Sequence, residues 1–100
     1  MSHFKKLFES TKTIAVVGLS NNPERASYRV SEYMLNQGYQ IIPVNPFADE
    51  ILGQKVFAQL SEIPFRIDLV NVFRTAKDCP AITQESVAIG AKSIWIQLGI

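Results

Sequence analysis

Residues that could hold an anion gather just after a short apolar run near the N-terminus. The run Ile14-Ala15-Val16-Val17 ends at Gly18, whose missing side chain would let the backbone come close to a ligand. The polar turn that follows leads into a helical pattern, and a helix start offers free N–H groups and a positive dipole end to a phosphate. Side-chain donors and cations accompany this turn and a later apolar run: Ser20, Asn22, Arg25, Ser27, Arg29 and Arg74. The set predicts a site for a polyanionic ligand; the alternative for Arg25 and Arg29 is that they are solvated charges on the surface of the helix.

A dinucleotide cofactor of the NAD type fits this turn poorly. Its fingerprint is G-x-G-x-x-G, with an acid about twenty residues further on that holds the ribose hydroxyls. Here Gly18 is followed by Ser20 and Pro23 at the other two glycine positions. The second apolar run ends in Asn45-Pro46 where the acid is expected, and Asp49 comes slightly late. NAD is therefore a weak candidate.

Catalytic and metal-binding patterns are weak in this sequence. His3 is the only histidine and lies next to the terminus. Cys79 is the only cysteine, which excludes an intrachain disulfide and fits a reducing compartment such as the cytoplasm. Asp49 and Glu50 are adjacent, so on a regular element they would not face one another. We therefore expect a binding protein without catalytic residues of its own and without a metal site.

Composition and charge indicate an ordinary globular domain. The 100 residues fit a single domain over residues 1–100, with 47% hydrophobic and 19% charged residues, which argues against a disordered chain. The net charge of +1 argues against bulk nucleic-acid binding, which needs a strong basic field. The apolar runs are too short to span a bilayer, so we expect no membrane segment.

Strand and helix patterns alternate along the chain. Apolar runs predict strands over 14–17, 39–44, 67–73 and 93–98, and helical spacing predicts helices before Gly38 and before Gly90. This alternation gives βαβ units and a parallel sheet, so we predict an α/β, Rossmann-like fold with helices on both faces. A short helix is expected at about residues 3–10. The strand predicted over 93–98 is apolar and would need other elements packed on both of its faces. We therefore expect the C-terminal part of the fold to be missing from this chain.

Two further predictions concern a proline within a strand and the cap of a helix. Pro43 lies inside the second predicted strand, where it cannot donate to a ladder, so we expect the ladder to be interrupted there. Asn22-Pro23 or Ser27 is expected to cap the helix that follows the first strand.

Four segments of the chain resemble the small bacterial CoA-binding proteins of the CoA-binding-domain superfamily: IAVVGLSNNPERASYRVSEYMLNQGYQIIPVNP, ILGQKVFAQLSEIP, DLVNVFR and AIGAKSIWIQLGI. That family shares its fold with the N-terminal domain of the succinyl-CoA synthetase alpha subunit, and the resemblance runs from Thr13 to Ile100. Ala26 stands where members commonly carry proline, which implies a less rigid loop.

The resemblance implies that coenzyme A, or an acyl-CoA, lies across the strand ends. Its phosphate-side contacts would be Gly18, Leu19, Ser20, Arg25, Ser27 and Tyr28. Asn45 and Pro46 would border the adenosine, and the pantetheine groove would be lined by Phe73, Arg74, Gln97 and Gly99.

Two other functions remain open from the sequence. One is an NAD(P)-binding enzyme, or a CoA-ligase-like component that needs a partner subunit. The other is an interaction module whose nucleotide crevice is vestigial. Exposed edges of the predicted sheet are also compatible with a homodimer.

Overall fold

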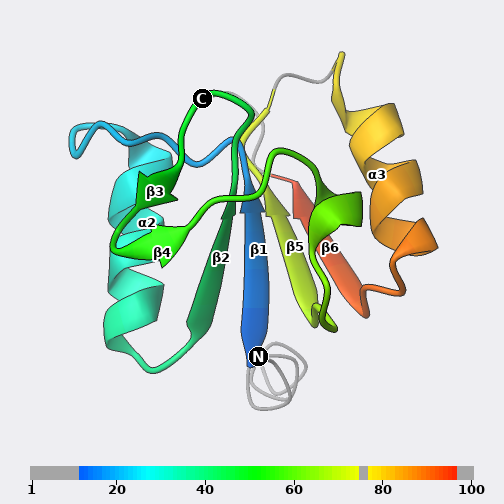
Figure 1. The fold of residues 1–100 in the computed structure, drawn as a ribbon, viewed down its shortest axis with the longest axis horizontal. Coiled ribbons are helices and arrows are strands. Elements are labelled where there is room, and N and C mark those ends of the chain that lie inside the picture. Colours follow the sequence, from blue (N-terminus) through cyan, green and yellow to red (C-terminus); the bar gives the residue numbers. More distant parts are fainter. Residues whose placement is uncertain (1–11, 75–76, 97–100) are drawn as a thin grey trace.

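The computed structural model describes residues 12–74 and 77–96 (Figure 1). In chain order its elements are β1 (Thr13–Val17), α2 (Ala26–Asn36), β2 (Gln40–Val44), β3 (Glu50–Ile51), β4 (Gln54–Lys55), the 3-10 turn η1 (Leu60–Glu62), β5 (Leu69–Val72), α3 (Cys79–Ala88) and β6 (Ser93–Ile96). The helix expected at about residues 3–10 lies outside the described residues.

The main sheet has four parallel strands in the order β2-β1-β5-β6. Val17, at the end of β1, lies opposite Val44 of β2 and Val72 of β5, so these three strands end at the same level. The crossovers through α2 and α3 carry the chain back to the end of the sheet where the strands begin. The arrows of the main sheet in Figure 1 therefore all point the same way. The predicted α/β, Rossmann-like architecture is confirmed, and it places the strand ends together along one edge.

The two helices cover opposite faces of the sheet. Ile14 and Val16 of β1 belong to the hydrophobic cluster that contacts Met34 of α2. Ala15 and Val17 belong to the second cluster, which packs against Ile82 of α3 and includes η1. A strand buried on both faces is apolar at every position, which is why its sequence reads as a continuous run. In the part of the chain that is described, no helix combines the length and apolar character needed to cross a membrane.

Pro43 does not interrupt the ladder, and that prediction is wrong. Pro43 lies opposite Val16, and pairing continues beyond it, with the Gly18 N–H donating to the Val44 carbonyl at 3.0 Å. Because β2 is an outer strand of the sheet, the position without an N–H faces away from β1. The Pro43 carbonyl on that outer side accepts a hydrogen bond from the Phe57 N–H at 3.0 Å.

The start of α2 also differs from the expectation. Arg25 is the N-cap residue and makes no side-chain cap hydrogen bond among the described residues, so capping by Asn22 or Ser27 is wrong. The Asn22 Oδ1 accepts instead from the Glu24 N–H at 3.0 Å, in a local turn before the helix. Ser27 lies inside the first turn, and its hydroxyl is used by the preceding loop.

Asp68 ties the opposite edge of the sheet together. Its Oδ2 accepts from the Lys12 N–H at 2.9 Å, the Thr13 N–H at 3.2 Å and the Thr13 hydroxyl at 3.2 Å. Its Oδ1 lies 3.6 Å from Lys92 Nζ. These donors, the Lys12 N–H above all, hold the pKa of the Asp68 carboxyl below its usual range. The clamp joins the beginnings of β1, β5 and β6, away from the strand ends where a ligand would bind.

Candidate functional site

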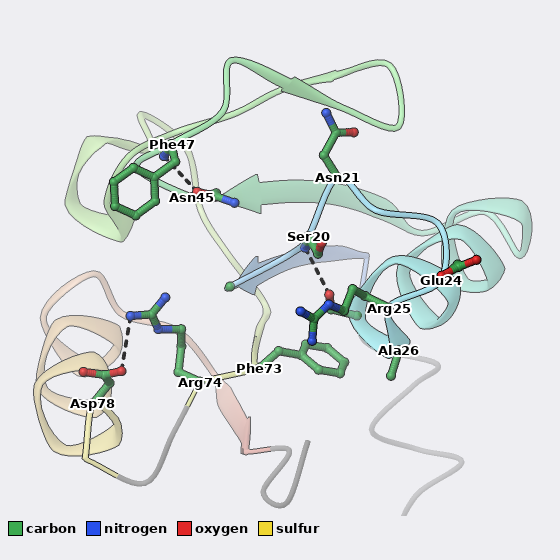
Figure 2. Close-up of a pocket in the computed structure, with 12 residues that line it drawn as sticks. Ser20, Asn21, Glu24, Arg25, Ala26, Asn45, Phe47, Phe73, Arg74 and Asp78 are labelled. Atoms are coloured by element: carbon green, nitrogen blue, oxygen red, sulfur yellow. Dashed lines mark hydrogen bonds and ion pairs between the residues drawn. The ribbon is translucent and has the colours of Figure 1, made fainter.

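A cavity of about 670 Å³ lies where the carboxyl ends of β1, β2 and β5 meet the start of α2 (Figure 2). Open parallel sheets bind their ligands at this edge. The cavity is lined by Gly18, Ser20, Asn21, Glu24, Arg25, Ala26, Ser27, Asn45, Phe47, Phe73, Arg74 and Asp78.

Gly18 allows the ends of β1 and β5 to meet. Its φ is +84°, and a Cβ built on it would lie 2.5 Å from the Phe73 carbonyl oxygen and 2.8 Å from Arg74 Cδ. The Phe73 N–H donates to the Val17 carbonyl at 2.8 Å, which holds this approach in place. A residue with a side chain would therefore meet both backbone strain and a steric clash. Gly18 thus has a role within the chain itself, and it also lines the cavity where the sequence predicts a close approach to a ligand.

Two serine hydroxyls hold the loop after β1 in shape. The Ser20 N–H donates to Ser27 Oγ at 3.0 Å, and the Asn22 N–H donates to Ser20 Oγ at 3.0 Å. Ser27 is 5% exposed, so the first of these bonds is shielded from water. The loop thus depends on side chains of its own and of α2, and it leads directly to the helix start.

The start of α2 is an electropositive wall of the cavity. The first N–H groups of a helix have no partner within the helix, and they carry the positive end of its dipole. The first turn of α2, all of it described, contains no acidic residue, and Arg25 stands at the N-cap position, directly after Glu24, which also lines the cavity. Arg25, Ala26 and Ser27 all line the cavity. This wall can accept an anion.

Arg74 faces the cavity from the end of β5 and is paired with Asp78. Arg74 Nη2 lies 3.2 Å from Asp78 Oδ2, and the two side chains are 43% and 37% exposed. An ion pair this open to water stabilises a protein by at most about 1 kcal/mol. A ligand with more than one negative charge could therefore compete with Asp78 for the guanidinium.

Asn45 links the loops that follow β1 and β2. Its Nδ2 donates to the Leu19 carbonyl at 3.0 Å, and its Oδ1 accepts from the Phe47 N–H at 2.8 Å. Both ends of the amide are thus engaged within the protein. The Phe47 side chain that follows is 90% exposed and lines the cavity.

Seven of the residues predicted from the sequence are brought together here: Gly18, Ser20, Arg25, Ser27, Asn45, Phe73 and Arg74. Leu19 is fully buried in the cluster under α2, and Tyr28 packs against that same cluster. Pro46 lines an adjoining cavity of about 230 Å³. Gln97 and Gly99 lie outside the described residues. Arg29 is exposed on α2 and is not among the lining residues.

The cavity also contains residues that the sequence did not single out: Asn21, Glu24, Ala26, Phe47 and Asp78. The first three belong to the loop and helix start where the sequence predicts an anion site. Asp78 carried a usable signal, since it follows Arg74 at the four-residue spacing of an ion pair. Phe47 directly follows the Asn45-Pro46 strand end, but nothing local distinguishes it from a core aromatic.

The adjoining cavity continues the site past the strand ends toward α3. It shares Gly18, Arg74 and Asp78 with the larger cavity. Its other walls are largely apolar, and they include Val17, Val44, Pro46, Ala58, Leu60, Ala81 and Ile82. The larger, polar cavity is thus continuous with a small, mostly apolar one around the Arg74–Asp78 pair.

A third cavity, of about 460 Å³, lies beside α2 rather than at the strand ends. Its lining is mostly apolar and includes Val30, Tyr33, Met34 and Trp95. Asn71, in the middle of β5, faces it, and among the described residues Asn71 Oδ1 is buried without a hydrogen-bond partner. No arginine or lysine is among its described lining residues, so this cavity is less suited to a phosphorylated ligand.

The parallel sheet, the helices on its two faces and the cavity at its strand ends define an α/β domain of the Rossmann-like class. More specifically, the chain belongs to the family described as "CoA binding domain", whose model matches residues 12–100. The family resemblance drawn from the sequence is thereby confirmed.

Relatives in this family include both a small protein and part of a large enzyme. The chain is 44% identical over 99 residues to the uncharacterized protein YneT of Bacillus subtilis, covering 99% of this chain and 73% of that protein. It is 31% identical over 88 residues to the acetate–CoA ligase [ADP-forming] II subunit alpha of Pyrococcus furiosus, covering 87% of this chain but 19% of that subunit. A solved structure of a hypothetical protein from Pyrococcus horikoshii superposes with a TM-score of 0.91 at 34% identity, covering 94% of this chain and 66% of that one.

Proposed function

We propose that this chain binds coenzyme A or an acyl-CoA at the carboxyl ends of its parallel strands, without catalytic residues of its own. The observation that carries the proposal is the convergence of the uncapped start of α2, Arg25 and Arg74 on one cavity. CoA carries a pyrophosphate and a 3′-phosphate, so it offers several negative groups to the two guanidinium groups and the helix start, in competition with the Glu24 and Asp78 carboxylates of the same lining. Membership of the CoA binding domain family supports the same ligand.

The lining residues divide naturally between the parts of this ligand. The α2 start and Arg25 would hold the pyrophosphate, while Ser20 and Ser27 keep the loop in the shape that exposes the helix N–H groups. Arg74 would exchange Asp78 for a phosphate oxygen, since a multiply charged ligand offers it more than one carboxylate does. The apolar cavity beyond Arg74 suits the uncharged pantetheine arm. The size of the main cavity, about 670 Å³, is within the range of small-molecule sites.

Calorimetric titration with CoA, dephospho-CoA and NAD in parallel tests the proposal. The variant R74Q should weaken CoA binding roughly tenfold, because a charge-assisted hydrogen bond to phosphate is lost. R66Q is the matched control, since Arg66 is exposed and is not among the residues lining the cavity. Equal loss in both variants would indicate only a net-charge effect. Binding of NAD without measurable binding of CoA would overturn the proposal.

A ligase-like component is the second candidate, and the match to an acetate–CoA ligase subunit favours it. The chain spans only 19% of that subunit, so such an activity would require a partner polypeptide. Formation of acetyl-CoA from acetate, CoA and a nucleoside triphosphate, or a second polypeptide that copurifies with the chain, would support this alternative. If none of the three ligands binds, an interaction module is the function that remains.

A further inference from the structure

Phe47 is a large apolar side chain left in water at the edge of the main cavity. Its exposed fraction of 90% is the highest among the large hydrophobic residues described, which otherwise reach 68% at Val87. Single exposed apolar residues are common on protein surfaces and need no explanation by themselves. Phe47 differs because it lines a cavity whose other walls carry Arg25 and Arg74 (Figure 2).

The backbone of Phe47 is fixed although its ring is exposed. Its N–H donates to Asn45 Oδ1 at 2.8 Å, and the same amide donates from Nδ2 to the Leu19 carbonyl at 3.0 Å. The two bonds tie Phe47 to the loop after β1 at Leu19, which is itself fully buried. The backbone of Phe47 therefore has a defined position relative to the start of α2 and Arg74, which line the same cavity. A side chain that extends from an ordered backbone needs only its own rotamer to be fixed on binding.

The wall formed by the end of β2 lacks a cation among its described residues. The cavity lining contributed by that loop consists of Asn45 and Phe47, whereas Arg25 and Arg74 come from the α2 start and the end of β5. Both ends of the Asn45 amide are already used within the protein. An uncharged, planar group suits this wall better than a phosphate does.

We propose that Phe47 stacks on the adenine of bound CoA and that Asn45 is its positioning residue. This inference rests on the proposed function and deepens it, because it names Phe47 as the residue that holds the base at the strand end where the family resemblance places the adenosine. Stacking on an aromatic ring is available to any nucleobase, and its loss by alanine substitution typically weakens binding by about 1–3 kcal/mol per base.

Titration with CoA and with 4′-phosphopantetheine, which lacks the adenosine, tests the stacking. F47A should weaken CoA binding roughly tenfold while leaving the affinity for 4′-phosphopantetheine unchanged. F47W should retain CoA affinity and F47L should not, since leucine keeps the apolar surface but not the ring face. The ring is exposed, so thermal unfolding followed by circular dichroism should be the same for all variants.

Several results would overturn the inference. CoA binding that is equal in F47A and the unaltered protein would refute stacking and leave the proposed function standing. Full affinity in F47L, or a parallel loss for 4′-phosphopantetheine, would also refute it, because neither depends on a base. If the unaltered protein binds no CoA, the proposed function fails and this inference fails with it.

The positioning role of Asn45 needs a separate readout. In the F47W protein, saturating CoA should quench the introduced indole, after subtraction of the Trp95 signal measured in the unaltered protein. Adding N45A should reduce this quenching at saturation, where differences in affinity no longer matter. Adding N45D should restore part of it, since an aspartate still accepts from the Phe47 N–H. Undiminished quenching with N45A would refute the positioning role.

Discussion

Replacing Gly18 by alanine should destabilise the protein far more than the same replacement at Gly90. Both glycines have a positive φ, +84° at Gly18 and +77° at Gly90, so an alanine pays a similar backbone penalty at either position. For a non-glycine residue in the left-handed region this penalty is roughly 1–2 kcal/mol. The surroundings of the new Cβ differ: it would meet nothing within 4 Å at Gly90, but the Phe73 carbonyl oxygen at 2.5 Å at Gly18.

The excess cost at Gly18 follows from what must move. A backbone oxygen cannot swing aside as a flexible side chain can, so the ends of β1 and β5 would separate. Such overpacking costs typically about 1–3 kcal/mol. The hydrogen bond from the Phe73 N–H to the Val17 carbonyl would weaken as well, at up to about 1 kcal/mol. We therefore expect G90A to cost about 1–2 kcal/mol and G18A about 2–6 kcal/mol.

Equilibrium unfolding in urea, followed by far-ultraviolet circular dichroism, measures this difference in free energy. Domains of this kind are stable by about 5–15 kcal/mol, so G18A should shift the midpoint strongly or prevent folding. A free energy of unfolding that falls equally in G18A and G90A, within about 0.5 kcal/mol, would refute the steric argument. Gly18 would then be required only for its backbone conformation.

Two further predictions concern charged groups at opposite edges of the sheet. D68N should lower the free energy of unfolding at neutral pH by about 1.5–3 kcal/mol, because the carboxylate accepts several hydrogen bonds in the folded state. Since folding lowers the pKa of Asp68, this stabilisation is present above the pKa of the unfolded state and is lost as the pH falls through the folded-state value. The unaltered and D68N unfolding curves, measured from pH 7 downward, should therefore converge in acid; a gap that stays constant would contradict the assignment. D78N should raise CoA affinity about threefold, because Arg74 no longer has a carboxylate partner, and weaker binding by calorimetry would show that Asp78 assists the ligand instead.

Local sequence pattern was sufficient to predict most of the fold. The β-branched run at Ile14 to Val17 indicated a strand buried on both faces, and its residues do alternate between the two hydrophobic clusters. Hydrophobic period and glycine positions indicated the two helices that cover the sheet. The prediction failed where a residue's role depends on its neighbours across the sheet. Pro43 is tolerated because β2 is an outer strand, which no window of sequence around it reveals.

The site divides in the same way. Residues of the loop after β1 and of the helix start that follows it, such as Ser20, Arg25 and Ser27, could be found by reading along the chain from Gly18. Arg74 could be added because the carboxyl ends of parallel strands meet at one edge. The detailed partners could not be predicted: Ser27 supports the Ser20 N–H rather than capping its helix.

The sequence by itself thus determined the order of the elements, the class of fold and the edge that carries the site, because each depends on residues close together in the chain. Tertiary structure alone decided that Gly18 must admit the Phe73 carbonyl, that Asp78 holds Arg74 at the cavity, and that Asn45 fixes Phe47 beside it. The first of these contacts joins the ends of two different strands, so its distance is set by strand order and register. The other two contacts join residues that are close together in the sequence. They matter for function only because the sheet brings the loops after β1, β2 and β5 around one cavity.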